Sequence, residues 1–150
     1  MAKKNLFTSY EKFVLAILAI VQFTVIMDFM VLAPLGTIVM DELTISPSQF
    51  ALVVSAYAAS AGISGLLSAL FADKFDRKPL LLFFYLGFIL GTLFCAIASN
   101  YEFLLMARIV TGIFGGVMSS ISYSIITDLF PIERRGTVMG FVQTAFATSQ

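Results

Sequence analysis

Long stretches without a single charged side chain constrain this chain more than any other feature of its sequence. One such stretch runs from Leu43 to Ala72, another from Pro79 to Tyr101, and a third lies between Arg108 and Asp128. A bilayer core about 30 Å thick is crossed by about 20 predominantly apolar residues in a helix. We therefore expect membrane-spanning helices near residues 13–36, 47–72, 79–98, 103–127 and 136–150, the last still running where the chain stops.

The composition agrees with a membrane protein and excludes several other classes. Hydrophobic residues make up 59% of the 150 residues and charged residues only 12%, too few to cover the surface of a small soluble domain. The nine basic and nine acidic side chains cancel, which removes the basic excess that nucleic-acid binding needs. With no histidine and one cysteine, Cys95, imidazole catalysis, a disulfide framework and a thiolate metal cluster are excluded. We expect neither an enzyme nor a metal or cofactor site.

Local signals predict where some of these helices begin and end. Ser46 and Gln49 flank Pro47 in the pattern of a capping box, with Ser46 as the N-cap of the second helix. Pro79 suits the first turn of the third helix, because its missing N–H needs no partner there. Pro34 lies inside the first span, so we expect that helix to kink or end in its outer third.

The basic residues fall on alternate connections between the predicted spans. Eight of the nine lie before the first, after the second or after the fourth span, and the other connections carry only acidic residues. By the positive-inside rule, this distribution predicts a cytoplasmic amino terminus in a multi-pass protein of the cell (inner) membrane. The basic residues are Lys3, Lys4, Lys12, Lys74, Arg77, Lys78, Arg134 and Arg135, and the acidic residues on the other connections are Asp41, Glu42 and Glu102.

The connection after the second span contains a cluster of charges. Asp73 ends a helix, where the helix dipole disfavours an anion, and it therefore needs neighbouring cations or the N-terminus of another helix. The cluster resembles the cytoplasmic motif between helices two and three of the major facilitator superfamily, Gly-x-Leu-Ala-Asp-Arg-x-Gly-Arg-Arg/Lys. Ala69 and Asp76 stand in place of its two glycines. The resemblance implies a gating motif that locks two transporter halves together, and an ordinary solvated turn is the alternative. The residues of this motif are Asp73, Lys74, Arg77 and Lys78.

The fourth span and the loop after it carry further motifs. Residues 108–116 resemble the Arg-x-x-x-Gly-x-x-Gly motif of helix four in the same superfamily, and residues 131–136 resemble its following loop. Asp128 matches the acidic residue that joins the helix-two/three cluster, and the Met27-Asp28-Phe29 stretch is similar to the drug and metabolite:proton antiporter branch. The resemblance covers the whole chain and implies an all-α integral membrane fold, the N-terminal part of a six-helix half. Because the chain stops inside its fifth helix, we expect residues 1–150 to be an incomplete N-terminal transmembrane half.

Two charged residues, Asp28 and Arg108, lie inside predicted spans. Intramembrane charges are candidate functional groups, and the helical rise places both in the outer half of the bilayer. We expect them to lie close enough for Arg108 to stabilise the ionised carboxylate of Asp28 across a cavity. Weakening the pair would let Asp28 take a proton, which is a coupling mechanism. The alternative is a static ion pair that holds the bundle together.

Uncharged residues of the spans are candidates for packing or for lining a substrate cavity. Small residues on the fourth span permit close helix contact and access of water. We assign helix packing to Gly112, Gly115 and Gly116. The candidates for the substrate cavity are Gln22, Tyr57, Thr111, Ser119 and Tyr123.

The resemblance and the two buried charges together predict a secondary active transporter, with proton-coupled efflux of a small solute by alternating access. Its expected partners are the lipid bilayer, protons, a small-molecule substrate and the missing C-terminal half of the same transporter. Two alternatives remain open. One is a truncated, non-transporting helical membrane module with an assembly or regulatory role. The other is an uptake permease of the same superfamily.

Overall fold

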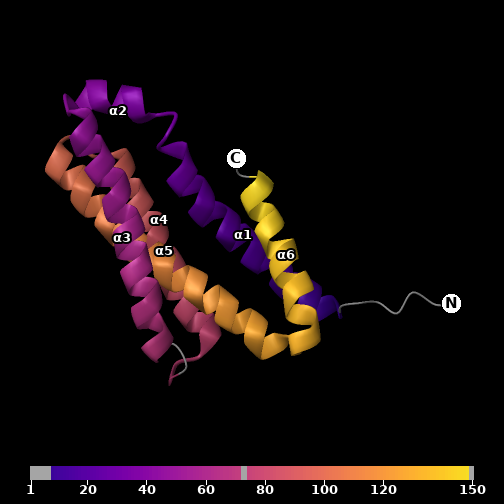
Figure 1. The fold of residues 1–150 in the computed structure, drawn as a ribbon. Coiled ribbons are helices and arrows are strands. Elements are labelled where there is room, and N and C mark those ends of the chain that lie inside the picture. The colour runs from indigo at the N-terminus through magenta and orange to yellow at the C-terminus, as the bar shows by residue number, and fades with distance from the viewer. Residues whose placement is uncertain (1–7, 72–73, 149–150) are drawn as a thin grey trace.

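The computed structural model describes residues 8–71 and 74–148, with side chains up to residue 144, and this part of the chain is helical with short connections. Four of its helices, α1, α3, α4 and α5, are long and apolar enough to cross a membrane. The architecture is therefore the predicted all-helical, multi-pass one (Figure 1). The helices are α1 (Ser9–Val31), α2 (Gly36–Leu43), α3 (Pro47–Phe71), α4 (Arg77–Ala96), α5 (Tyr101–Leu129) and α6 (Ile132–Thr148).

Each predicted span overlaps a helix, but α4 and α5 begin two residues earlier than predicted, and α1 and α6 begin four residues earlier. α1 begins at Ser9 because Thr8 and Glu11 form a capping box, in which the Glu11 N–H donates to Thr8 Oγ1 at 3.3 Å and the Thr8 N–H donates to Glu11 Oε2 at 2.6 Å. α6 begins at Ile132. The predicted starts at residues 13 and 136 are late because they relied on the absence of charge, whereas an acidic residue stabilises the first turn of a helix. Residues 72, 149 and 150 of the predicted spans lie outside the described residues.

Pro34 ends the first long helix, as predicted. α1 stops at Val31, residues 32–35 form turns, and the short helix α2 starts at Gly36. Proline lacks the N–H that would continue the helix, and its ring collides with the carbonyl four residues earlier. The expected single span up to residue 36 is thus split, and α2 lies across one end of the bundle (Figure 1).

The chain turns from α2 into α3 through a left-handed residue. Thr44 has a φ of 51° and is the one non-glycine residue with positive φ among the described residues. The predicted capping box follows directly, since the Ser46 N–H donates to Gln49 Oε1 at 2.9 Å and the Gln49 N–H donates to Ser46 Oγ at 3.3 Å. Pro79 lies in the first turn of α4, also as predicted.

α5 is the helix around which the others are arranged. It packs closely against both α3 and α4, whereas α1 packs mainly against α6 and more loosely against α5. Figure 1 shows α3, α4 and α5 side by side, with α1 and α6 as a second pair next to them. α5 is also the most buried of the four spans, so its side chains connect the two groups of helices.

Small residues let α3 and α5 approach each other closely. A Cβ added at Gly112 would collide with the hydroxyl of Ser60, and one added at Gly116 would collide with the carbonyl oxygen of Ala61. The Ser64 hydroxyl donates a hydrogen bond to the carbonyl of Ile113 across this contact, at 3.0 Å. Close backbone packing and interhelical hydrogen bonds are the main forces that associate helices in lipid.

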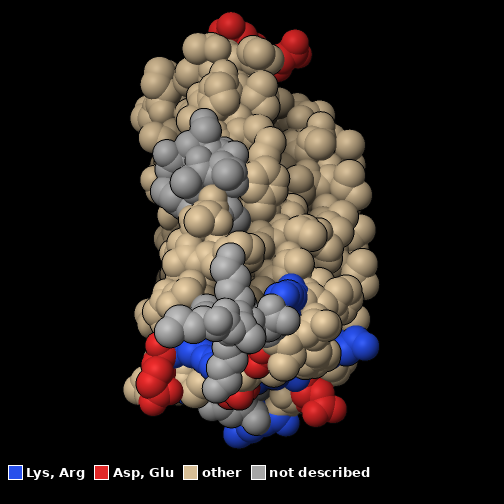
Figure 2. Space-filling model, turned by 90° about the vertical axis from the view of Figure 1, so that its right-hand side faces the viewer, with Lys and Arg blue, Asp and Glu red and all other residues tan. Residues whose placement is uncertain are grey.

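The surface of the bundle is apolar between its two ends. On the face shown in Figure 2, charged side chains gather near the two ends and uncharged side chains cover the region between them. Large apolar side chains are widely exposed along the spans, with Leu66 at 77% and Leu70 at 75%. Soluble monomers rarely expose apolar surface on this scale. A bilayer covers it.

A methyl group added at the α3–α5 contact should separate the two helices. We expect Gly116→Ala to lower the free energy of unfolding by about 1–3 kcal/mol, because the rigid carbonyl of Ala61 cannot give way. Gly62→Ala is the matched control, since nothing lies within 4 Å of a Cβ placed there. Unfolding in detergent, followed by circular dichroism, measures both. Equal stability of the two variants would contradict this close contact.

Candidate functional site

The two charges inside the spans form a buried ion pair. Arg108 Nη1 of α5 donates to Asp28 Oδ2 of α1 at 2.8 Å. The side chains are only 4% and 7% exposed, respectively. The Thr92 hydroxyl of α4 donates to the other carboxylate oxygen, Oδ1, at 3.0 Å. Three helices that are far apart in the sequence therefore meet at one carboxylate.

The position of Asp28 in its helix makes a cationic partner necessary. Asp28 lies in the last turn of α1, where the helix dipole disfavours a negative charge. Burial adds a larger cost, because a carboxylate without a paired cation is expensive to remove from water. Arg108 offsets both effects at hydrogen-bond distance, and Thr92 satisfies the oxygen that the guanidinium leaves free.

An aromatic pair lies beside the guanidinium. The Cζ atom of Arg108 is 5.5 Å from the centroid of the Tyr57 ring, within the range of a cation–π interaction. Tyr57 in turn packs against Phe29, with ring centroids 5.6 Å apart. The Tyr57 hydroxyl and Arg108 Nε are both buried and have no hydrogen-bond partner among the described residues.

A cavity of about 440 Å³ extends from the ion pair toward α2. We call it the α2 chamber. Helices α1, α2, α4 and α5 all contribute to it, and its chemically distinctive lining residues are Asp28, Glu42, Thr92, Cys95 and Arg108.

Sequence reasoning did not select three of these chamber residues, namely Glu42, Thr92 and Cys95. Thr92 and Cys95 are three positions apart on α4, so they share one helix face. Two such residues on one face of an otherwise apolar span are the feature of the sequence that could have indicated their place in a polar site. Glu42 contributed only to the predicted topology. Its place in the chamber could not be predicted, because it depends on the direction that the chain takes after the break at Pro34.

The residues predicted to line a substrate cavity lie in several different places. Tyr57 lies beside Arg108, and Gln22 is buried on α1. Thr111 lies in the contact between α5 and α4, where its hydroxyl donates to the Ala107 carbonyl at 2.7 Å and approaches Cys95 Sγ at 3.7 Å. It is not among the residues that line the α2 chamber.

The two remaining cavity candidates lie further along α5, and one glycine lies near the aromatic pair. Ser119 and Tyr123 are half-buried, and the Tyr123 hydroxyl accepts from Gln143 Nε2 of α6 at 3.5 Å. A Cβ added at Gly115 would lie 3.0 Å from the Tyr57 hydroxyl and 3.3 Å from the Phe88 ring. Gly115 therefore leaves room for these two side chains next to α5.

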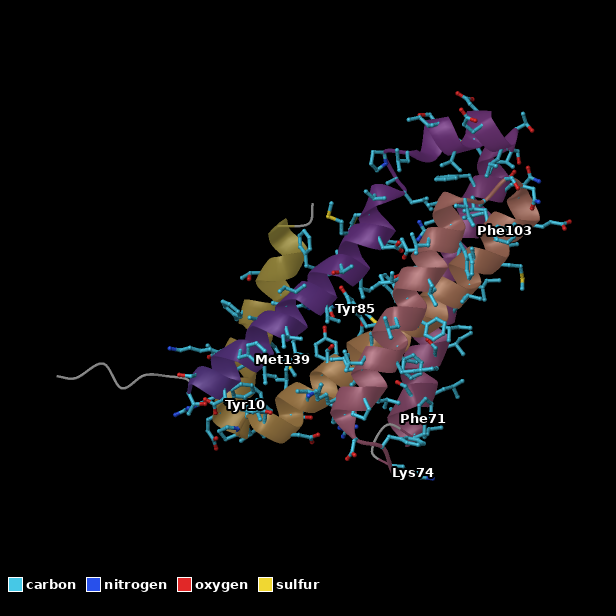
Figure 3. The ribbon with its side chains drawn as sticks, turned by 180° about the vertical axis from the view of Figure 1, so that it is seen from behind. Tyr10, Phe71, Lys74, Tyr85, Phe103 and Met139 are labelled. Carbon is cyan, nitrogen blue, oxygen red and sulfur yellow. The ribbon has the colours of Figure 1, made fainter. Side chains whose placement is uncertain are left out.

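The charge cluster at the far end of the bundle contains an interhelical ion pair. Arg77 Nε, at the start of α4, lies 3.0 Å from Asp128 Oδ2, in the last turn of α5. Each charge is disfavoured by the dipole of its own helix, so the pair compensates both. Lys74 and Lys78 are exposed, and Figure 3 shows Lys74 at the opposite end of the bundle from Phe103. Asp73 lies outside the described residues.

Arg135 is a further charged residue of this end, which sequence reasoning used for the topology and for the loop motif but did not assign to a site. Its guanidinium donates to the carbonyl of Thr127 at 2.7 Å and to that of Phe130 at 3.0 Å. These carbonyls lie at the C-terminus of α5, which has no intrahelical donors left for them. A cation there also complements the helix dipole. Arg135 therefore fixes the turn between α5 and α6.

The spans and the buried ion pair define a polytopic helical membrane protein with a charged polar centre. Residues 18–150 match the Major Facilitator Superfamily, and the chain belongs to that superfamily, whose members are transporters rather than enzymes. The predicted family is thus confirmed.

Relatives and solved structures agree with this assignment. The chain is 33% identical over 101 residues to Multidrug resistance protein 3 of Bacillus subtilis, covering 67% of this chain and 20% of that protein. It is 35% identical over 102 residues to Efflux pump dotC of Dothistroma septosporum, covering 68% of this chain and 18% of the pump. It therefore spans about a fifth of the length of these relatives.

The fold is similar to a solved structure of a bacterial homolog to the human lysosomal transporter Spinster, in an inward-facing and occupied conformation. The TM-score is 0.87 at 21% sequence identity, over 95% of this chain and 31% of that structure. At this identity the similarity concerns the fold. It shows that the described helices are arranged as in part of that structure.

Removing Arg108 from the buried pair should cost more stability than removing the Thr92 hydroxyl that donates to Asp28. We expect Arg108→Met to lower the free energy of unfolding by about 3–5 kcal/mol, because it leaves a buried carboxylate without its cation. Thr92→Val should cost less, about 1.5–3 kcal/mol, the value of one hydrogen bond to a charged group. Combining Arg108→Met with Asp28→Asn should cost less than the sum of the two single changes. Additive losses in detergent unfolding would show that the charges do not interact.

Proposed function

We propose that this chain is the N-terminal part of a proton-coupled efflux transporter that works by alternating access. The observation that carries the proposal is the buried Asp28–Arg108 pair at 2.8 Å, in a superfamily of transporters. Two relatives bear the names of a multidrug resistance protein and an efflux pump. Their names favour export over uptake. The proposed solute is small and amphipathic or cationic.

The proposed coupling step is a change in the protonation of Asp28. While Arg108 donates to the carboxylate, the ionised form is favoured. A conformational change or a bound cation that weakens this contact leaves a carboxylate in an apolar surrounding, where the neutral form is favoured. Asp28 then takes up a proton. Restoring the contact releases the proton, so proton movement is linked to the conformational cycle.

The proposed location is the inner or plasma membrane of the cell. The proposed orientation places the amino terminus in the cytoplasm. Arg77, Lys78 and Arg135 lie at the end of the bundle where α4 begins and α5 ends. Asp41 and Glu42 lie on α2, at the other end (Figure 1). The positive-inside rule puts the basic end in the cytoplasm. The ion pair then lies in the half of the bundle nearer the outer surface.

The proposed cytoplasmic gate is the charge cluster around Arg77 and Asp128. The 3.0 Å contact between their side chains joins the start of α4 to the end of α5. Asp73, Lys74 and Lys78 would complete the cluster. The proposed partner of this surface is the second half of the transporter, which would supply the opposite wall of the substrate pathway. Gln22, Ser119 and Tyr123 would face that pathway.

Replacement of Asp28 tests the coupling. In the protein encoded by the full reading frame, reconstituted in proteoliposomes, we expect Asp28→Asn to abolish substrate-dependent proton flux, because an amide cannot exchange a proton. Glu102→Gln removes an exposed acidic charge at the start of α5 and should leave the flux unchanged. The stability of each variant is measured in parallel. Unchanged flux with reduced stability would mean that the pair is a static brace.

Replacement of Asp128 tests the gate. Asp128 is 59% exposed, so we expect Asp128→Asn to lower stability by less than about 1 kcal/mol, as for other exposed ion pairs. Transport by the protein of the full reading frame should nevertheless slow at least several-fold, if the cluster controls the conformational cycle. Glu133→Gln, an exposed acid in the first turn of α6, is the matched control. A normal transport rate in Asp128→Asn would contradict the gating role.

A further inference from the structure

The α2 chamber has an unbalanced negative charge. The charged side chains that line it are Asp28, Glu42 and Arg108. Asp28 and Arg108 neutralise each other at 2.8 Å. Glu42 is exposed and has no hydrogen-bond or ion-pair partner among the described residues. It therefore leaves the chamber with a net charge of about minus one, which attracts cations toward the lining.

Arg108, one of the residues that line the chamber, also has a buried donor that needs an acceptor. Arg108 is only 3% exposed, and its Nε has no hydrogen-bond partner among the described residues. A buried N–H without an acceptor is costly, so such groups are commonly bound to water. The cavity of about 440 Å³ exceeds the roughly 30 Å³ that one water occupies in the liquid. The chamber therefore has room for water next to the residue whose Nε lacks an acceptor.

The break in the first span makes the chamber reach the surface. Because α1 ends at Val31 and α2 lies across the end of the bundle (Figure 1), residues of both helices line one cavity. Asp28 lies at its inner end, beside α5, and the exposed Glu42 lies on α2. An uninterrupted helix would carry Glu42 about 21 Å beyond Asp28 along one axis. The turn at Pro34 brings the two carboxylates to the same chamber.

We propose that the α2 chamber is a hydrated, cation-attracting vestibule, through which small monovalent cations reach Asp28 from the α2 end of the bundle. Glu42 supplies the attracting charge, and the chamber supplies the water. The inference deepens the proposed function, since it names the route to the carboxylate proposed to couple transport. The vestibule can be tested without a transport assay, because one of the residues that line the chamber can be labelled chemically.

The reporter is Cys95, the single cysteine of the 150 residues. It lines the chamber and is half-buried and free of a disulfide. A thiol-reactive compound must enter the chamber to modify it. Compounds of the same reactivity but opposite charge therefore report the electrostatic potential inside the chamber, once any cysteine elsewhere in the protein has been replaced.

The test compares the rates at which Cys95 reacts with two methanethiosulfonates of similar size, one carrying a trimethylammonium group and one carrying a sulfonate. The protein is that encoded by the full reading frame, in lipid nanodiscs, with every cysteine other than Cys95 replaced by serine. The ratio of the two rates is divided by the ratio for a free thiol in solution. We expect the cationic reagent to be favoured. Glu42→Gln should reduce this preference by about three- to fivefold, the effect of removing one nearby charge. High salt should reduce it as well.

Asp41→Asn is the matched control, because Asp41 is an exposed acid on the same helix that does not line the chamber. We expect it to retain most of the preference for the cation. An equal effect of the two substitutions would show a general surface potential and overturn the role of Glu42. Failure of both charged reagents to modify Cys95, while a neutral, lipid-permeable maleimide does so, would show a dry chamber and overturn the vestibule. Neither result would decide whether Asp28 couples transport.

Discussion

The contact between Asp28 and Arg108 is the interaction on which the rest of this structure depends. It joins α1 to α5, and through Thr92 it also includes α4. In lipid there is no hydrophobic force to gather apolar helices, so polar contacts and close packing must do so. A charge pair of this kind imposes a register between helices, because any rotation that separates the partners leaves a charge in an apolar environment.

The packing around α5 allows this contact to form. Gly112 and Gly116 bring α3 against one side of the helix, and Gly91 brings Thr111 and α4 against another. With both neighbours held close, the side chain of Arg108 can reach across to α1. The same arrangement explains why the helix that carries the arginine is also the most buried of the four spans. Close packing surrounds a polar centre whose two charges would separate if α1 moved relative to α5.

The sequence predicts the spans and the pair for a simple reason: Asp28 and Arg108 are the only charged residues inside their predicted spans. The break at Pro34 and the capping box at Ser46 follow from local chemistry in the same way. The direction of uncharged side chains could not be predicted, because it depends on how each helix is rotated about its axis. Thr111 therefore lies against α4 rather than in the chamber, and Thr92, which contacts Asp28, was missed. Glu42 joins the chamber only because of the position that α2 takes after the break.

The most direct test of the coupling role is the protonation state of Asp28 itself. Infrared difference spectra of the protein encoded by the full reading frame resolve the C=O stretch of a protonated carboxyl, and Asp28→Asn assigns the band. A coupling role predicts that a band of protonated Asp28 appears when a transported compound or a change of conformation weakens the contact with Arg108. Asp28 that stays ionised throughout the cycle would contradict this role and leave the pair as a structural element.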